Sequence, residues 1–143
     1  MRVPYRVYYA DTDAGGVVYH GAYLRIFEVA RNELARSHAI SLAQHAAAGV
    51  YFVVRSAQVE FRAPALFDDL LEVEVEARRE TRATLRFGYR VWVVERGGRP
   101  HADPAGPIAS GSTVLVCCRA APERGAIRPI RLPDAVARLC GDA

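Results

Sequence analysis

Residues 8–31 read YYADTDAGGVVYHGAYLRIFEVAR, and this stretch decides the fold. It opens with Tyr-rich extended residues, breaks at two aspartates and two glycines, and then carries apolar residues at helical spacing. Aspartate favours turns through its own side-chain hydrogen bonds, and glycine permits positive φ. We therefore predict a strand over residues 3–10, a loop over residues 11–16, and a helix that begins at His20 or Gly21.

The predicted helix has one broad apolar face. Six of its residues lie on that face, namely Tyr23, Ile26, Phe27, Val29, Ala30 and Leu34. Such a wide stripe is typical of a helix that is covered by other parts of the protein around most of its circumference. Glu28 and Arg31 form an i,i+3 pair on the remaining face. A short second helix is predicted over residues 41–48, capped by Ser41 and ended by Gly49.

The rest of the chain is rich in strand patterns. Strands are predicted over residues 50–62, 70–79, 83–94 and 107–119, followed by an irregular stretch over 120–131 and a terminal helical turn over 133–139. Two of these strands alternate strictly, with inward positions Leu71, Val73, Val75, Ala77, Leu85, Phe87, Tyr89, Val91 and Val93. Alternation of this kind indicates one face on a core and one face in water.

The turn over residues 80–82 predicts an antiparallel hairpin between these two strands. A pivot near Thr81 would place Glu76 opposite Arg86 and Glu72 opposite Arg90. Since one helix cannot cover both faces of a sheet, the sheet is expected to curve around it. The prediction is an α+β fold in a single domain over residues 1–143: an antiparallel sheet of five to six strands wrapped around one long helix.

Composition excludes several classes of protein. The net charge is +3, and all nineteen basic residues are arginine, so a Schiff-base lysine and a Walker A loop are both absent. The arginines are scattered among carboxylates, which argues against nucleic-acid binding. No apolar run is long enough for a membrane span, no secretory signal is evident, and the three cysteines form no CxxC pair. We expect a cytoplasmic protein with reduced thiols.

The simplest interpretation of the DTDAGG break is a turn that caps a helix. A calcium loop is the next candidate, because Asp11, Asp13 and Gly16 match its first, third and sixth positions. It fails at the twelfth position, where Ala22 stands in place of a bidentate glutamate. Nor do His38, His45 and His101 have metal-ligand spacing, so no metal site is predicted.

A catalytic interpretation rests on the helix start. A helix N-terminus offers free N–H groups and partial positive charge, which can hold an oxyanion. Asp13 lies on a loop that can fold back over that end, where its carboxylate could attack a carbonyl or activate a water. This chemistry suits an acyl group with a good leaving group, such as a thioester. A serine-hydrolase elbow is excluded because no GxSxG occurs.

The same residues carry a family resemblance. Residues 11–13 (DTD), Gly16, residues 17–20 (VVYH), Tyr23, Phe27, Glu28 and Arg31 resemble the signature of the 4-hydroxybenzoyl-CoA thioesterase family, especially its YbgC-type, Tol–Pal-associated acyl-CoA thioesterases. A weaker likeness continues through FRAPALFDDLLEVEVEARRETRATLRF, so the resemblance covers most of the chain. Gly15 and Gly21 depart from the bulkier residues of many members.

The resemblance implies a hotdog fold whose site lies between two subunits and needs neither metal nor organic cofactor. It implies that Asp13 is the catalytic carboxylate and that the polarising amide belongs to His20. The His20 ring either orients water or Asp13, or is purely structural. Tyr19 is either core or pocket wall, and Asp11 is expected to order the turn.

Arg79 and Arg82, with Arg78, form a cluster that either binds the phosphates of CoA or is a solvated turn. The predicted function is hydrolysis of an acyl-CoA by a homodimer or homotetramer, with an acyl carrier protein as a further candidate partner. A non-catalytic module that binds acyl-CoA or acyl carrier protein is the first alternative, and a hotdog hydratase is the second. The acyl group, and the choice between a covalent anhydride and direct attack by water, stay open.

Overall fold

The computed structural model describes residues 1–120 and 125–141. Its elements are, in chain order, β1 (Arg2–Arg6), η1 (Tyr9–Asp11), α1 (Ala22–Ser37), α2 (Leu42–Ala47), β2 (Tyr51–Phe61), β3 (Leu70–Arg79), β4 (Thr84–Arg96), β5 (Arg99–Pro100), β6 (Ala109–Ala120), β7 (Ile127–Pro129), α3 (Asp134–Ala137) and η2 (Arg138–Cys140). The predicted helices and main strands are confirmed within a few residues of their expected ends, except that the strand predicted over residues 3–10 ends at Arg6 and is followed by η1.

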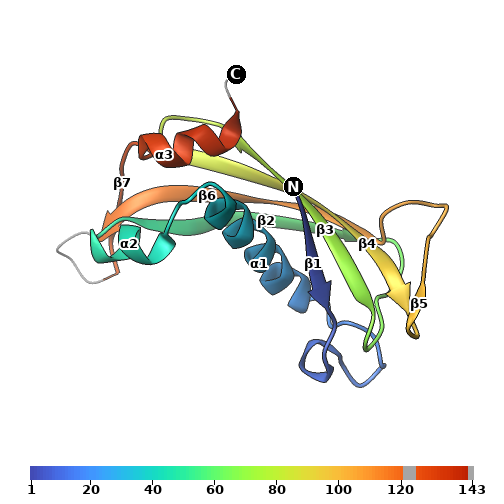
Figure 1. Ribbon diagram of the computed structural model, residues 1–143. Coiled ribbons are helices and arrows are strands. Elements are labelled where there is room, and N and C mark those ends of the chain that lie inside the picture. The colour runs from blue at the N-terminus through green and yellow to red at the C-terminus, as the bar shows by residue number, and fades with distance from the viewer. Residues whose placement is uncertain (121–124, 142–143) are drawn as a thin grey trace.

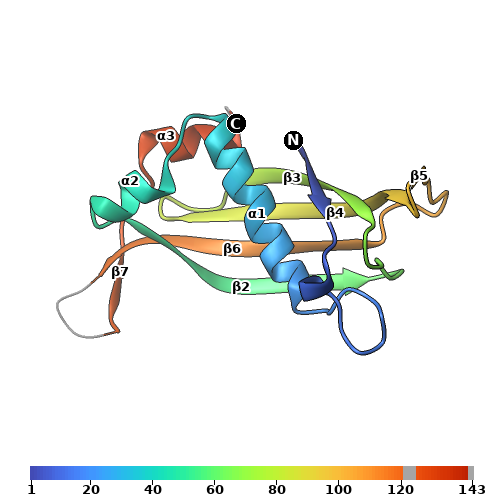
Figure 2. The same cartoon turned by 60° about the horizontal axis from the view of Figure 1, so that its bottom comes forward.

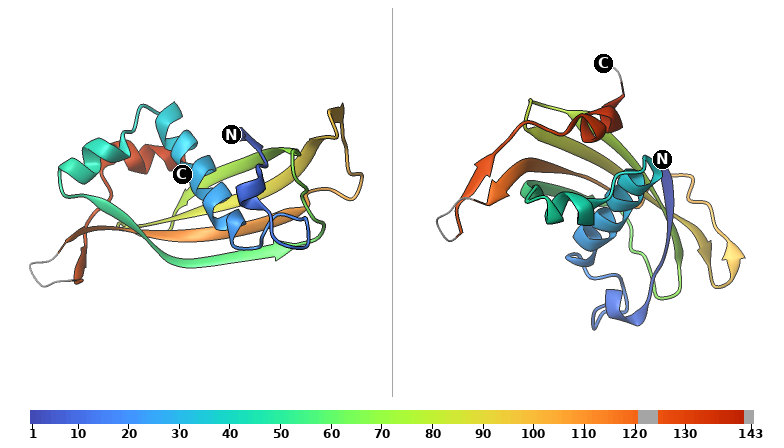
Figure 3. Two further views of the ribbon diagram at one scale, coloured as in Figure 1. Left: turned by 90° about the horizontal axis from the view of Figure 1, so that it is seen from below. Right: turned by 60° about the vertical axis from the view of Figure 1, so that its left-hand side comes forward.

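One antiparallel sheet bends around α1 (Figure 1). The main strands follow the order β1-β3-β4-β6-β2, so β1 and β2 form the two edges. Figure 2 shows α1 running across the concave face, and the turned views in Figure 3 show the curvature of the sheet around it. The predicted sheet wrapped around a long helix is confirmed. It has seven strands rather than five or six, because two short strands were not predicted: β5 pairs with β4, and β7, in the stretch expected to be irregular, pairs with β6.

The apolar face of α1 is buried as predicted. Five of the six expected residues are buried, namely Tyr23, Ile26, Phe27, Ala30 and Leu34, while Val29 is half-buried.

Phe27 holds α1 close to the sheet. Its ring is stacked on Tyr89 of β4, with centroids 4.1 Å apart and an interplanar angle of 1°. Gly111 of β6 makes this approach possible, because a Cβ there would lie 2.4 Å from the Gln58 carbonyl oxygen and 2.7 Å from the Phe27 ring. Both distances are shorter than van der Waals contact allows. Position 111 therefore has to be glycine for α1 to pack this close to β6.

The alternation of β3 and β4 is confirmed: every predicted inward residue is buried. The opposite face carries charged residues around Trp92, with the guanidinium of Arg2 5.0 Å and that of Arg90 5.8 Å from its ring centroid. That face therefore meets water through a charged layer, while the concave face holds the core.

The predicted register of the β3–β4 hairpin is wrong by two residues. Arg90 lies opposite Glu74 rather than Glu72, and Arg86 lies opposite Arg78 rather than Glu76. The cause is a four-residue turn over 80–83, closed by a 3.0 Å hydrogen bond from Glu80 N to Thr84 O. Opposite charges still pair across the two strands, because Arg90 donates a hydrogen bond to Glu74. This hydrogen bond holds the pKa of Glu74 below its ordinary value.

The second helix and the C-terminal stretch follow the predictions closely. Ser41 caps α2 by accepting a 3.2 Å hydrogen bond from Gln44 N, and Gly49 follows the helix with φ of +79°. The terminal helical turn is confirmed as α3 and η2. Part of the irregular stretch predicted over 120–131 falls on residues 121–124, which lie outside the described residues.

Candidate active site

Asp11 is the structural aspartate of the break between β1 and α1. Its carboxylate is 1% exposed. It accepts hydrogen bonds from Tyr5 Oη at 3.0 and 3.1 Å and from Tyr8 N at 2.9 Å, and it forms an ion pair with Arg25 of α1. The Asp11 carbonyl oxygen also accepts a 2.8 Å bond from Tyr19 N. Because both of its oxygens are occupied, Asp11 orders the turn, as predicted, and is not available for reaction.

Asp13 stands two residues later and is exposed. Its loop is closed by a 3.0 Å hydrogen bond from Asp13 N to Val17 O and by a turn bond of 3.0 Å from Gly16 N to Asp13 O. Gly16 has φ of +76°, which a glycine adopts without strain. The Asp13 Oδ1 accepts a 2.8 Å bond from Gly15 N, and within the described residues the other oxygen has no hydrogen-bond partner. One carboxylate oxygen is therefore free to react.

The start of α1 offers unused donors. Gly21 is the N-cap and supplies no side-chain cap. The first helical N–H groups, including those of Ala22 and Tyr23, bond back to preceding carbonyls. By contrast, no acceptor for the N–H groups of His20 and Gly21 is found in residues 1–120 and 125–141. Figure 2 shows the segment between β1 and α1 at the N-terminal end of α1. Free N–H groups at a helix start can hold an oxyanion, and the loop that carries Asp13 leads directly into this start.

Tyr19 and His20 lie together at this end of the helix, with ring centroids 4.3 Å apart. Both side chains are exposed, so Tyr19 is not part of the core. The Tyr19 ring folds over Gly21, where an added Cβ would lie 2.6 Å from it. Gly21 thus allows the Tyr19 ring to cover the start of α1.

The structure does not bring Arg79 and Arg82 to this loop within one chain. Val17 bridges to Leu66, just before β3, whereas Arg79 is the last residue of this ten-residue strand. A ten-residue strand is about 30 Å long at roughly 3.3 Å per residue. Arg79 Nε donates to Thr81 O at 3.2 Å, and the Arg82 carbonyl accepts from Leu132 N at 2.8 Å. The two arginines therefore lie at the opposite end of the sheet from Asp13.

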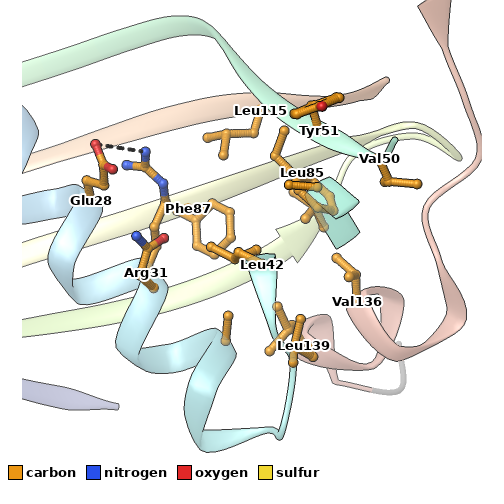
Figure 4. Close-up of a pocket in the computed structure, with 15 residues that line it drawn as sticks. Glu28, Arg31, Leu42, Val50, Tyr51, Leu85, Phe87, Leu115, Val136 and Leu139 are labelled. Carbon is orange, nitrogen blue, oxygen red and sulfur yellow. Dashed lines mark ion pairs between the residues drawn. The ribbon is translucent and has the colours of Figure 1, made fainter. Parts of the chain in front are cut away.

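Sequence patterns did not reveal an apolar cavity of about 240 Å³ beside the second half of α1. Figure 4 shows side chains from α1, α2, β2, β4, β6 and the C-terminal helix pointing into it. Glu28 and Arg31 stand at one end as the predicted i,i+3 pair, with 3.8 Å between Arg31 Nη2 and Glu28 Oε2. The wall comes from segments far apart in the chain, so no local signal could have predicted it.

Other reactive groups in the described residues offer no alternative centre. No group of three His, Cys, Asp or Glu side chains in residues 1–120 and 125–141 could hold a metal ion. Cys117 and Cys118 are both buried, and burial raises the pKa of Cys117 to about 11. A thiol with so high a pKa is a poor nucleophile. Within the same ranges, no helix has the length and apolar character required to cross a bilayer.

The chain is similar to several known proteins. The family described as the thioesterase superfamily matches residues 15–98, beginning two residues after Asp13. The acyl-CoA thioester hydrolase YbgC of Escherichia coli O6:H1 is 48% identical over 91 residues, which cover 64% of this chain and 68% of the relative. The acyl-CoA thioesterase YbgC of Haemophilus influenzae is 35% identical over 136 residues, which cover 93% of this chain and 88% of the relative.

The fold has solved counterparts. The crystal structure of a 1,4-dihydroxy-2-naphthoyl-CoA thioesterase from Synechocystis aligns with a TM-score of 0.83 at 26% identity, covering 99% of this chain and 95% of that one. A protein from Aquifex aeolicus aligns with a TM-score of 0.80 at 26% identity, covering 98% of each chain. The predicted hotdog fold is confirmed.

Proposed function

This chain belongs to the thioesterase superfamily, and from that premise we propose that it hydrolyses an acyl-CoA to a carboxylic acid and free CoA, with Asp13 as nucleophile or general base. The enzyme class is supported by the family and by the YbgC relatives. The observation that carries the role of Asp13 is its free carboxylate oxygen in a loop next to the unused N–H groups of His20 and Gly21.

The proposed chemistry needs few groups. The carbonyl oxygen of the thioester accepts hydrogen bonds from the N–H groups of His20 and Gly21, and one such donor is worth about 3 kcal/mol of barrier. An Asp13 oxygen then attacks the carbonyl carbon, the C–S bond breaks, and CoA leaves as a thiolate that takes a proton from water. Water hydrolyses the resulting anhydride. In the second route Asp13 removes a proton from water, which attacks directly. Because a thiol has a pKa near 8.5, its thiolate is a good leaving group, and the C–S bond can break without a strong general acid.

We further propose that the working unit contains two copies paired through β2. This edge strand is eleven residues long, contains no proline, and exposes Tyr51, Val53, Val54 and Phe61. The other edge, β1, has five residues, among them Pro4 and two arginines, and so is poorly suited to pairing. A two-fold axis would set the two β2 strands antiparallel, so the beginning of one would lie beside the end of the other. Such pairing would bury apolar surface that is exposed in one chain.

A second copy would also give the substrate more surface than one chain offers. Arg79 and Arg82 remain candidates for the CoA phosphates only if the partner's copies of them come near Asp13, since in one chain they lie at the opposite end of β3. Tyr19 remains a candidate for the pocket wall because its exposed ring covers the start of α1.

Release of free thiol from a panel of acyl-CoAs tests the function. We expect turnover with at least one of them, and a loss of turnover in Asp13→Asn. Asp68→Asn is the matched control, because Asp68 is another exposed carboxylate in a loop and the same atoms change. Full activity in Asp13→Asn, or no thiol release from any acyl-CoA, would favour the non-catalytic binding module. A single turnover in ¹⁸O-water places label in Asp13 only if the anhydride forms.

Sedimentation tests the pairing of β2. Val54→Lys places a charge on the exposed face of that edge and is expected to give monomers with little thiol release. Pro4→Lys does the same on the β1 edge and should leave the assembly intact. Monomers that retain full activity would rule out a site that needs two copies.

A further inference from the structure

We propose that Asp69 and Arg96 are positioning residues for the reaction, because their ion pair holds the supporting loop, residues 64–69 (PALFDD), on which both flanks of the Asp13 loop rest. The inference rests on the proposed thioesterase function and deepens it, since it names what places the carboxylate of Asp13. Neither residue is near the DTD motif in the sequence: Asp69 directly precedes β3, and Arg96 is the last residue of β4.

Asp69 and Arg96 are joined by two parallel hydrogen bonds. Arg96 Nε donates to Asp69 Oδ1 at 3.0 Å and Arg96 Nη2 donates to Asp69 Oδ2 at 2.7 Å, while the Asp69 side chain is 1% exposed. Two more bonds hold the supporting loop itself, from Leu66 N to Asp69 Oδ2 at 2.8 Å and from Arg96 Nη2 to Pro64 O at 3.2 Å. Paired bonds between guanidinium and carboxylate fix orientation as well as distance. The end of β4 therefore fixes both ends of the supporting loop.

The chain that enters the Asp13 loop rests on the supporting loop. Val7 N donates to Asp69 O at 2.9 Å, so the residue with the buried carboxylate also holds the chain just after β1. The ring of Tyr9 is stacked on that of Phe67, with centroids 3.7 Å apart and an interplanar angle of 8°. A backbone hydrogen bond and an aromatic contact thus fix the entry to the loop.

The chain that leaves the Asp13 loop rests on the same support. Val18 N donates to Ala65 O at 2.9 Å, and Val17 forms an antiparallel bridge with Leu66. Both Ala65 and Val18 are buried. The 3.0 Å hydrogen bond from Asp13 N to Val17 O then closes the loop. A displacement of the supporting loop therefore reaches Asp13 through one further backbone hydrogen bond.

The side chain of Asp13 does little to hold its own position. It is exposed, and within residues 1–120 and 125–141 its carboxylate accepts a single hydrogen bond, from Gly15 N in the same loop. The backbone of the loop thus sets the direction of the carboxylate. A displacement of about 1 Å at a reacting group can cost roughly 100-fold in rate. Because a buried ion pair adds little net stability over apolar residues of the same size, orientation is the role that the Asp69–Arg96 pair fits best.

Steady-state kinetics separate positioning from stability. Thiol release is measured well below the Tm of each variant, so that every chain is folded. Asp69→Asn should lower kcat by about tenfold or more and change KM by less than about threefold, because Asp13 is present but displaced. Arg96→Lys keeps the positive charge without the paired hydrogen bonds and should lower kcat in the same way. This second variant keeps the proposal testable if Asp69→Asn does not fold.

Asp103→Asn is the matched control. Asp103 Oδ2 also pairs with an arginine, at 2.6 Å from Arg62 Nη2, and its Oδ1 accepts a 2.9 Å bond from Ala105 N. In the described part of the chain, however, its side chain makes no hydrogen bond to residues 7–20. Its kcat should therefore equal that of the wild type. A loss in Asp103→Asn as large as in Asp69→Asn would overturn the assignment to this ion pair.

A double variant shows whether Asp69 acts through Asp13. In the Asp13→Asn background, Asp69→Asn should lower the remaining activity by less than about twofold, because a positioning residue acts only through the group that it positions. A further loss as large as in the wild-type background would show that Asp69 acts independently of Asp13, and would overturn the proposal.

Amide hydrogen exchange follows the loop without relying on activity. Asp69→Asn should speed the exchange of Asp13 N–H and Val18 N–H by about tenfold or more, and Asp103→Asn should leave both unchanged. Unchanged exchange in folded Asp69→Asn, or a wild-type kcat in both Asp69→Asn and Arg96→Lys, overturns the positioning role. If the wild type releases no thiol from any acyl-CoA, the proposed function is refuted instead, and exchange still decides whether the ion pair holds the loop.

Discussion

The two aspartates of the DTD motif should separate stability from activity. They differ by two positions, yet Asp11 is buried with both oxygens hydrogen-bonded, whereas Asp13 is exposed with one oxygen free. We compare Asp11→Asn with Asp13→Asn. Both changes replace a carboxylate by an amide of the same size, so they differ only in what surrounds the group.

Asp11→Asn should destabilise the fold by about 2 kcal/mol. The change removes the charge that meets Arg25 and turns an NH₂ group toward donors such as Tyr5 Oη and Tyr8 N. Hydrogen bonds to a charged group contribute roughly 1.5–3 kcal/mol. The side chain of Arg25 is 56% exposed and can return to water, which keeps the cost below the roughly 3–5 kcal/mol of a fully buried pair. A loss of about 2 kcal/mol lowers Tm by roughly 4–8 °C in a domain of this size.

Asp13→Asn should behave in the opposite way. Asparagine Oδ1 can still accept the hydrogen bond from Gly15 N, and exposed positions change stability by about 0.5 kcal/mol or less. Loss of a general base lowers kcat/KM by roughly 10²- to 10⁴-fold. Denaturant unfolding at fixed protein concentration and thiol release measure the two effects. Equal stabilities for the two variants, or a folded Asp11→Asn that is as inactive as Asp13→Asn, would refute this division of roles.

Three further predictions concern the scaffold. Gly111→Ala should cost about 1–3 kcal/mol in denaturant unfolding, because the new methyl group meets the Phe27 ring, and an unchanged midpoint would contradict that packing. Asp69→Asn should lower Tm by several degrees, since this 1% exposed carboxylate loses its charged partner Arg96 at 2.7 Å; equal stability would show that the pair is dispensable. Burial raises the pKa of Cys117 to about 11, so the thiol of the unfolded chain ionises near pH 9, before the thiol of the folded protein. The free energy of unfolding should therefore fall between pH 9 and 11. The fall should be less steep in Cys117→Ala, and an identical slope in the two proteins would contradict the shift.

Features that depend on neighbours in the chain were predictable from the sequence. The wide apolar stripe of α1 and the strict alternation of β3 and β4 follow from helical and strand periodicity, and the structure confirms both. The same holds for Ser41 as the cap of α2, since a cap acts within one turn. Asp13 and the N-cap Gly21 are eight residues apart, so local order alone places the Asp13 loop at the N-terminal end of α1.

Features that depend on distant contacts were decided only by the tertiary structure. The four-residue turn over 80–83 shifted the hairpin register, and the position of Arg79 far from Asp13 follows from the length of β3. The burial of Asp11 depends on Tyr5 and Arg25 reaching it from the elements on either side.

The cavity shows the difference most clearly. Its apolar lining residues read in the sequence as ordinary apolar positions, and nothing local marks them as part of a cavity. It exists because α1, α2, the sheet and the C-terminal helix pack around a space that none of them fills. The sequence by itself determined which residues face inward and which carboxylate loop precedes the helix. How those inward faces meet was decided by packing between distant segments, because periodicity specifies the direction of a side chain but not its partner.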